Sequence, residues 1–253
     1  MRHICQRVVD VSTDYEYHLL PLRQPDEYGS VLGVDGCRAG WVCFRVDLQS
    51  RRTTVEIIGK IAELTTGQPR PRLVAIDIPI GLPTKGPRAC DLAARRLLGQ
   101  PRSSSVFPSP VRATLTASTY QDACALSLQA QGKSLSKQAF EIISKIREVD
   151  DLITPDLQMW IFEVHPEVSF WALNGRRPLK HGKLKREGKE ERLGLLLPHY
   201  PAIEAHLGEI KRMKGGADDL LDAAAAAWTA ECVAKGAVPR QFDSRGLRME
   251  IVY

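Results

Sequence analysis

The sequence feature that most constrains the fold is a pair of short apolar runs that each end in an aspartate. Residues 31–36 end in Asp35 and a glycine, and residues 72–78 carry Asp77 just before Pro79. Both runs have the composition of strands, and the second is apolar enough to be buried on both faces, as in a parallel sheet. Because burying a lone carboxylate is costly, an aspartate in this position usually has a cation, a group of donors or a metal as its partner.

Two later stretches offer further carboxylates. Glu163 lies near the end of the apolar run 159–164, and residues 218–222 place several aspartates at the start of an alanine-rich stretch. We expect the fold to gather these acids with Asp35 and Asp77. Carboxylates about 4 Å apart repel by roughly 4 kcal/mol at an intermediate dielectric constant, so such a group needs divalent cations or protonation. Ligands that are all oxygen favour Mg²⁺ or Mn²⁺ over zinc.

The composition narrows the class of protein. The chain has 253 residues, 43% of them hydrophobic and 26% charged, as in ordinary globular proteins. Its six cysteines form no C-x-x-C pair and do not resemble a disulfide framework, so we expect reduced thiols, no thiolate zinc site and a cytoplasmic location. We expect no signal peptide and no membrane span. The net charge of +5 permits an anionic partner such as nucleic acid without requiring one.

Hydrophobic periodicity predicts a mixed α/β domain. Strands are expected at residues 31–36, 41–48, 53–58, 72–78, 159–164 and 247–253, and helices at 60–64, 88–98, 120–131, 134–153, 167–174, 190–197, 201–212 and 218–235. The first three strands predict an antiparallel meander, and the later strands are joined through helices. We predict a single domain over residues 30–253 with a helical insertion at about 84–131, preceded by a partly ordered extension over residues 1–29.

Small residues precede both strand-ending aspartates. Side chains alternate along a strand, so Gly33 shares a face with Asp35, and Ala75 shares a face with Asp77. A helix could approach the sheet closely at these two small residues, just beneath the acids. The five consecutive alanines at 223–227 suit that helix.

Several motifs, taken together and in order, resemble a known family. They are GVDGCRAGW at 33–41, IDIPIGLP at 76–83, GPRACD at 86–91, SSSVFP at 103–108, SKQA at 136–139, EVHPE at 163–167 and DDLLDA at 218–223. The chain resembles domain-of-unknown-function family 429, which is described as a predicted nuclease of ribonuclease H-like fold. The resemblance covers roughly residues 31–253.

This resemblance implies a five-stranded mixed sheet of order 3-2-1-4-5, flanked by helices. In that order the first and fourth strands are neighbours, so Asp35 and Asp77 would lie side by side. The last helix of such nucleases supplies further acids, and Asp219 and Asp222 match the spacing of three residues that puts two side chains on one helix face. These four residues would hold the metal ions and act in catalysis. Glu163, at the end of the fifth strand, departs from the plain pattern and is an additional catalytic candidate.

The resembling motifs also contain candidate substrate-binding residues. Arg88 and Lys137 belong to the segments 84–112 and 133–147, whose basic side chains could bind phosphates, and His165 is a third candidate for substrate binding. The implied activity is metal-dependent hydrolysis of phosphodiester bonds in DNA or RNA. The sequence leaves the oligomeric state open, a homodimer included.

Each candidate also has a structural interpretation. Asp35 could cap a turn, Asp219 could serve the helix dipole, and Glu163 and His165 could belong to a polar cluster at a helix start. The basic run 180–189 is typical of a solvated loop.

Two other functions stay open. One is a phosphohydrolase or phosphotransferase acting on a small phosphorylated molecule, although the chain has no G-x-x-x-x-G-K-[ST] loop. The other is a non-catalytic binding module that kept the ribonuclease H-like fold.

Overall fold

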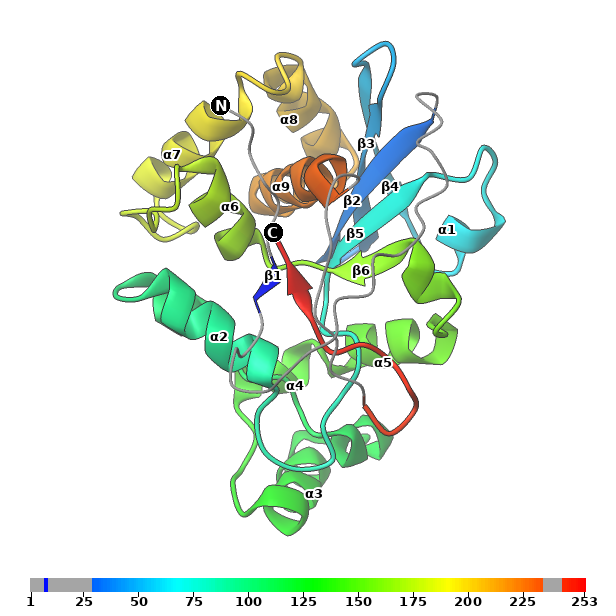
Figure 1. Cartoon of the computed structure of the whole chain (residues 1–253), viewed down its shortest axis with the longest axis vertical. Coiled ribbons are helices and arrows are strands. Elements are labelled where there is room, and N and C mark those ends of the chain that lie inside the picture. Colours follow the sequence, from blue (N-terminus) through cyan, green and yellow to red (C-terminus); the bar gives the residue numbers. More distant parts are fainter. Residues whose placement is uncertain (1–6, 9–28, 234–242) are drawn as a thin grey trace.

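A five-stranded mixed sheet forms the centre of the molecule (Figure 1). The computed structural model describes residues 7–8, 29–233 and 243–253, so nearly all of the expected extension 1–29 lies outside the described residues. The sheet strands are β2 (Ser30–Cys37), β3 (Gly40–Asp47), β4 (Thr53–Ile58), β5 (Leu73–Asp77) and β6 (Ile161–Glu163). Their spatial order is β4-β3-β2-β5-β6, with β2, β3 and β4 antiparallel and β5 and β6 parallel to β2.

If the five strands of this sheet are numbered 1 to 5 along the chain, starting at β2, their order is 3-2-1-4-5. The predicted fold class is therefore confirmed. The arrangement is consistent with a ribonuclease H-like fold. The meander forms because short turns connect its three strands, whereas β5 and β6 are separated by the long helical segment between Asp77 and Ile161.

The helices surround this sheet. They are α1 (Glu63–Thr66), α2 (Ala89–Leu98), α3 (Tyr120–Gln131), α4 (Lys137–Glu141), α5 (Ile143–Leu152), α6 (Pro166–Leu173), α7 (Arg186–Leu196), α8 (Ile203–Arg212) and α9 (Ala217–Val233). Short 3-10 turns lie at Arg102–Ser105, Arg112–Thr116 and Leu157–Met159. No helix among the described residues combines the length and the apolar character that a bilayer crossing needs.

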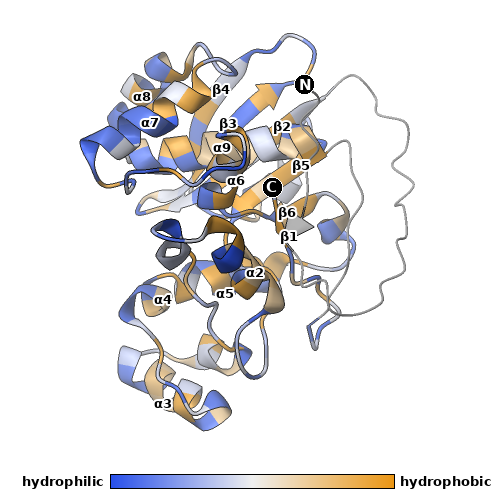
Figure 2. Cartoon of the chain, turned by 60° about the vertical axis from the view of Figure 1, so that its left-hand side comes forward, coloured by the Kyte–Doolittle hydropathy of each residue, from blue (hydrophilic) through white to orange (hydrophobic). Residues whose placement is uncertain are grey.

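Helix α9 packs directly on the centre of the sheet because Gly33 has no side chain. A Cβ atom at Gly33 would lie 1.9 Å from the backbone oxygen of Ala223 and 2.2 Å from the backbone nitrogen of Ala227. Ala75 on the neighbouring strand is fully buried. The predicted close approach of an alanine-rich helix is therefore confirmed, and it fixes α9 against β2 at the level of the backbone. In Figure 2, β5 is drawn mainly in the hydrophobic colour, as expected for a strand buried on both faces.

The predicted helix 134–153 is divided in two. Ser136 caps α4 by accepting a hydrogen bond from the backbone nitrogen of Ala139 at 3.2 Å, and the chain leaves regular helix geometry at Ile142 before α5 begins. Two cores lie along this segment. Ala139 of α4 and Ile143, the first residue of α5, belong to a small cluster with α3, whereas Ile146 belongs to the main core. Helix α5 therefore contributes to both cores.

Helix α3, within the segment predicted as a helical insertion, lies at one end of the molecule. Figures 1 and 2 both show it far from α7 and α8. Its small core contains Ala117, Ala123, Leu135, Ala139 and Ile143, and so includes residues of α4 and α5 beyond the predicted bounds. Helix α2, which lies inside the predicted bounds, packs instead with α6 and the end of the chain.

The predicted closing strand is shorter than expected. Only β7 (Ile251–Val252) is a strand, and it pairs antiparallel with β1 (Arg7–Val8). Val252 also forms a parallel bridge with Val164, next to β6, so the end of the chain lies beside the sheet.

Candidate metal centre

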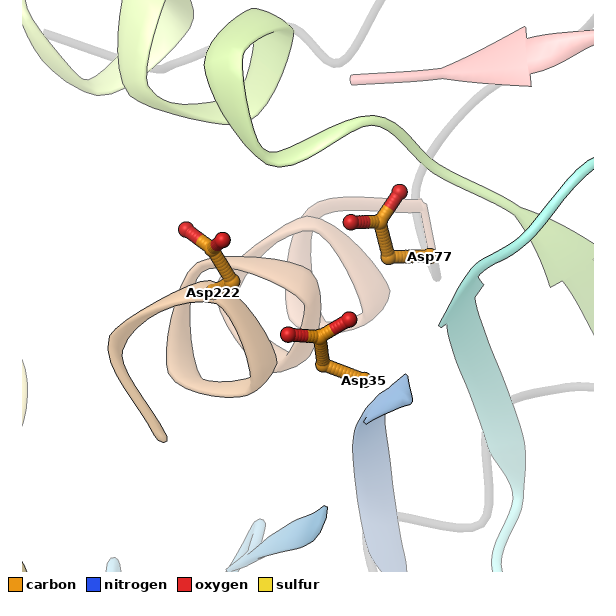
Figure 3. A group of neighbouring side chains, drawn as sticks. All are labelled: Asp35, Asp77 and Asp222. Carbon is orange, nitrogen blue, oxygen red and sulfur yellow. The ribbon is translucent and has the colours of Figure 1, made fainter. Parts of the chain in front are cut away.

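Three aspartates from three different elements meet at one edge of the sheet. Asp35 lies on β2, Asp77 ends β5, and Asp222 lies in the second turn of α9. One carboxylate oxygen from each residue lies within 4.8 Å of the other two (Figure 3). Asp35 is 6% exposed and Asp222 is 2% exposed. We call these residues the aspartate cluster.

The local fold explains why the cluster forms. Asp35 and Asp77 are register partners on parallel strands, so the two carboxylates lie side by side. Asp222 immediately precedes Ala223, the residue whose backbone lies against Gly33. Since Gly33 and Asp35 share a face of β2, the same close approach brings Asp222 to Asp35.

The electrostatics of the cluster call for a cation. Burial, followed by the charges of Asp77 and Asp222, raises the pKa of Asp35 well above its usual range. Burial and Asp222 raise the pKa of Asp77 to about 7. Without a cation, therefore, the cluster still holds protons near neutral pH, where isolated carboxyl groups have already lost theirs.

The donor set fits a hard divalent metal. All three ligands are carboxylates, Asp35 and Asp222 are buried while Asp77 is half-buried, and their oxygens are close enough to share one ion. Asp35, Asp77 and Asp222 would hold it, and the arrangement does not distinguish Mg²⁺ from Mn²⁺.

A lysine also contacts the cluster. The ammonium nitrogen of Lys183, from the segment between α6 and α7, donates a hydrogen bond to Asp222 Oδ2 at 2.7 Å. Burial alone would lower the pKa of Lys183, but Asp222 and Asp35 raise it above its ordinary value. The interpretation of residues 180–189 as a purely solvated loop is therefore wrong at this position. No local pattern distinguishes Lys183 from the basic residues around it in the sequence.

Asp219 is placed differently from the other predicted metal ligands. Its Oδ2 accepts a hydrogen bond from the backbone nitrogen of Gly216 at 3.1 Å, at the start of α9. Burial, then the neighbouring Asp218, raises its pKa. Asp219 is half-buried and stays outside the three carboxylates that meet, although its charge also acts on Asp35.

Glu163 and Arg88 pair with each other away from the cluster. The Arg88 guanidinium donates to both oxygens of Glu163, at 2.6 Å each, and it also contacts Asp91. Glu163 in addition accepts a hydrogen bond from the backbone nitrogen of Ile80 at 2.7 Å. Arg88 is 2% exposed, so these contacts tie α2 to β6 and do not favour the substrate-binding role expected of Arg88.

The two other predicted substrate-binding residues lie in different surroundings. His165 caps α6: its Nδ1 accepts a hydrogen bond from the backbone nitrogen of Glu167 at 3.3 Å, and burial lowers its pKa. Its pKa also responds to the charges of Asp222 and Lys183, so it lies near the cluster. Lys137 is exposed at the start of α4.

A cavity of about 460 Å³ lies beside the same edge of the sheet. It is bounded by the turn between β2 and β3, by the end of β4 and by α5. Its walls carry the basic residues Arg38, Lys60, Lys145 and Arg147 together with the acidic residues Glu148 and Asp151, so basic residues outnumber acidic ones. Lys145 donates to the backbone oxygen of Gly40 at 2.6 Å, and its ammonium lies 4.3 Å from the centre of the Trp41 ring.

Comparison with known proteins identifies the family to which the chain belongs. No curated protein and no solved structure matches the chain. A family model described as "Protein of unknown function (DUF429)" matches residues 33–244, which is most of the sequence and includes Asp35, Asp77 and Asp222. The chain belongs to the DUF429 family.

Proposed function

We propose that this protein is a divalent-metal-dependent hydrolase that cleaves phosphodiester bonds in nucleic acid. The observation that carries the proposal is the meeting of three carboxylates, two buried and one half-buried, within 4.8 Å at the ends of neighbouring strands and on the helix packed against them. A metal bound there would activate water and stabilise the leaving oxygen. The chain's own contribution is to hold Asp35, Asp77 and Asp222 in fixed positions and to shield them from bulk water.

Nucleic acid is the favoured substrate because positive charge lies beside the cluster. The cavity walls carry Arg38 and Lys60, both exposed, and Lys145. A phosphate backbone that passes the aspartate cluster could place a neighbouring phosphate in this cavity. A small molecule with a single phosphate held at the cluster would have no second phosphate for these residues to bind.

The test is a cleavage assay with labelled single strands, duplexes, branched junctions and RNA–DNA hybrids, in Mn²⁺, in Mg²⁺ or in chelator. We expect metal-dependent cleavage that falls at least a hundredfold in Asp77→Asn and in Asp222→Asn, because each change removes a charged ligand. Glu204→Gln, an exposed acid on α8, serves as the matched control and should retain activity.

Other outcomes would contradict the proposal. Metal-dependent hydrolysis confined to small phosphoesters would indicate a phosphohydrolase. Tight nucleic-acid binding with no cleavage under any metal would indicate a non-catalytic module. Cleavage that survives in Asp77→Asn would exclude the aspartate cluster as the active site.

A further inference from the structure

Lys183 reaches the aspartate cluster from a loop that is held in place by several contacts. The side chain of Glu191 accepts hydrogen bonds from the backbone nitrogens of Lys180 and His181, at 3.0 and 3.1 Å. The guanidinium of Arg192 donates to the backbone oxygen of His181 at 3.2 Å. Both anchoring residues lie on α7, so the loop is attached to that helix.

A close backbone contact tightens the same loop. Gly188, in the first turns of α7, lies so near residue 182 that a Cβ atom at Gly188 would be 2.1 Å from the backbone oxygen of Gly182. Arg192 is 1% exposed and forms an ion pair with Glu167 on α6. The position of Lys183 is therefore set by the packing of α6 and α7, and does not depend on a freely moving surface chain.

The lysine and a metal would compete for the same carboxylates. The Lys183 ammonium donates to Asp222 Oδ2 at 2.7 Å, and one oxygen of Asp222 lies within 4.8 Å of oxygens from Asp35 and Asp77. A cation bound among these oxygens would be repelled by an ammonium group that stays in place. The side chain of Lys183 is 43% exposed and has a long flexible stem, so it can swing toward solvent without disturbing the anchored backbone.

The geometry points to Lys183 as a built-in counter-ion of the aspartate cluster, which a divalent metal displaces and which then binds a phosphate oxygen of the substrate. This inference rests on the metal-binding part of the proposed function. It assigns the loop between α6 and α7 a role at the active site. It also explains how the buried carboxylates of Asp35 and Asp222 avoid unscreened repulsion before metal arrives.

The test is direct measurement of Mn²⁺ binding by calorimetry at one pH, with no substrate present. The variants are Lys183→Met, which keeps the stem and removes the charge, and Lys183→Arg, which keeps the charge. Lys185→Met, an exposed lysine in the same loop, is the matched control. We expect Lys183→Met to bind Mn²⁺ roughly tenfold more tightly, equivalent to about 1.4 kcal/mol, and the other two variants to bind like the wild type.

A second measurement separates this role from simple support of the fold. If Lys183 also binds phosphate, Lys183→Met should have a higher KM for the cleaved oligonucleotide even at saturating Mn²⁺, and Lys183→Arg should restore much of the loss. A structural defect would instead weaken Mn²⁺ binding in both variants.

The outcomes distinguish the two proposals. Unchanged or weaker Mn²⁺ binding in Lys183→Met, with binding lost in Asp77→Asn, would overturn the role of Lys183 and leave the metal centre standing. No Mn²⁺ binding in either the wild type or Lys183→Met would overturn both.

Discussion

At the scale of single residues, the ionisation of Asp77 couples stability to pH. Burial and the charge of Asp222 raise its pKa from the ordinary value of 3.8 to about 7, so the folded state binds this proton more tightly than the unfolded chain does. The stability contributed by the proton is complete below about pH 4 and is lost as the pH rises through about 7. A bound metal should reverse this loss, because it replaces the proton.

The corresponding measurement compares the wild type with Asp77→Asn in chelator. Asparagine has nearly the same shape and does not titrate, so groups far from Asp77 cancel in the difference. The titration of Asp35, whose pKa the charge of Asp77 raises, contributes to the measured change. We expect the unfolding free energy of the wild type, relative to the variant, to fall by about 1–3 kcal/mol between pH 4 and pH 8. Added Mn²⁺ should stabilise the wild type more at pH 8 than at pH 5. A difference that does not change with pH would show that Asp77 titrates normally.

Some of the residues at the cluster could be predicted from the sequence and others could not, depending on how far along the chain their contact partners lie. Asp35 and Asp77 could be found because each follows its own apolar run. The two residues are then brought side by side because they are register partners on parallel strands. Asp222 was selected through the family resemblance, by a spacing that also selected Asp219, which lies outside the cluster. Lys183 could not, because its contact with Asp222 spans 39 residues and depends on how α6 and α7 pack. The pairing of Glu163 with an arginine 75 residues away was hidden for the same reason.

At the scale of elements, the contact between β2 and α9 controls the geometry of the metal centre. Gly33→Ala would place a methyl group 1.9 Å from the backbone oxygen of Ala223, and neither backbone can yield locally. We expect α9 to shift, at a cost of about 2–4 kcal/mol in the free energy of unfolding, measured by urea denaturation. Mn²⁺ affinity should fall as well, because Asp222 moves with the helix.

The control for this prediction is Gly194→Ala, in the last turn of α7, where a Cβ atom would meet nothing within 4 Å. That change should be neutral or stabilise the protein by up to about 1 kcal/mol, because alanine favours helix. Equal effects of the two substitutions would contradict the importance of the close approach.

The order of helices and strands was largely predictable from the sequence, and the predictions that were wrong concern single elements. The meander and the two buried strands were predicted from the hydrophobic pattern, and the family resemblance implied the order of the sheet. The break at Ile142 was not predicted, because one apolar periodicity runs through residues that pack into two separate cores.

At the scale of the whole molecule, the positive cavity beside the cluster should contribute to nucleic-acid binding. The prediction is tested in an Asp77→Asn background, where binding can be measured without cleavage. Replacing Arg38 and Lys60 by alanine should weaken binding and reduce the slope of log K against log salt by roughly 1.4–1.8, as expected for two lost phosphate contacts. Fluorescence anisotropy over a series of salt concentrations gives this slope.

The matched control removes two exposed charges on α8, Lys211→Ala with Arg212→Ala. Because it changes the net charge by the same amount, it separates a local contact from a general effect of charge. An equal loss of slope in both double variants would argue against a defined phosphate site in the cavity.

The backbone contact at Gly33 has a consequence for access to the aspartate cluster. Where a helix lies directly against a strand, with no side chain between them, the two cannot slide apart in small steps. The wall of the cluster formed by β2 and α9 is therefore rigid. Access can instead change at the Lys183 side chain, which is 43% exposed and reaches Asp222 from a loop outside this wall.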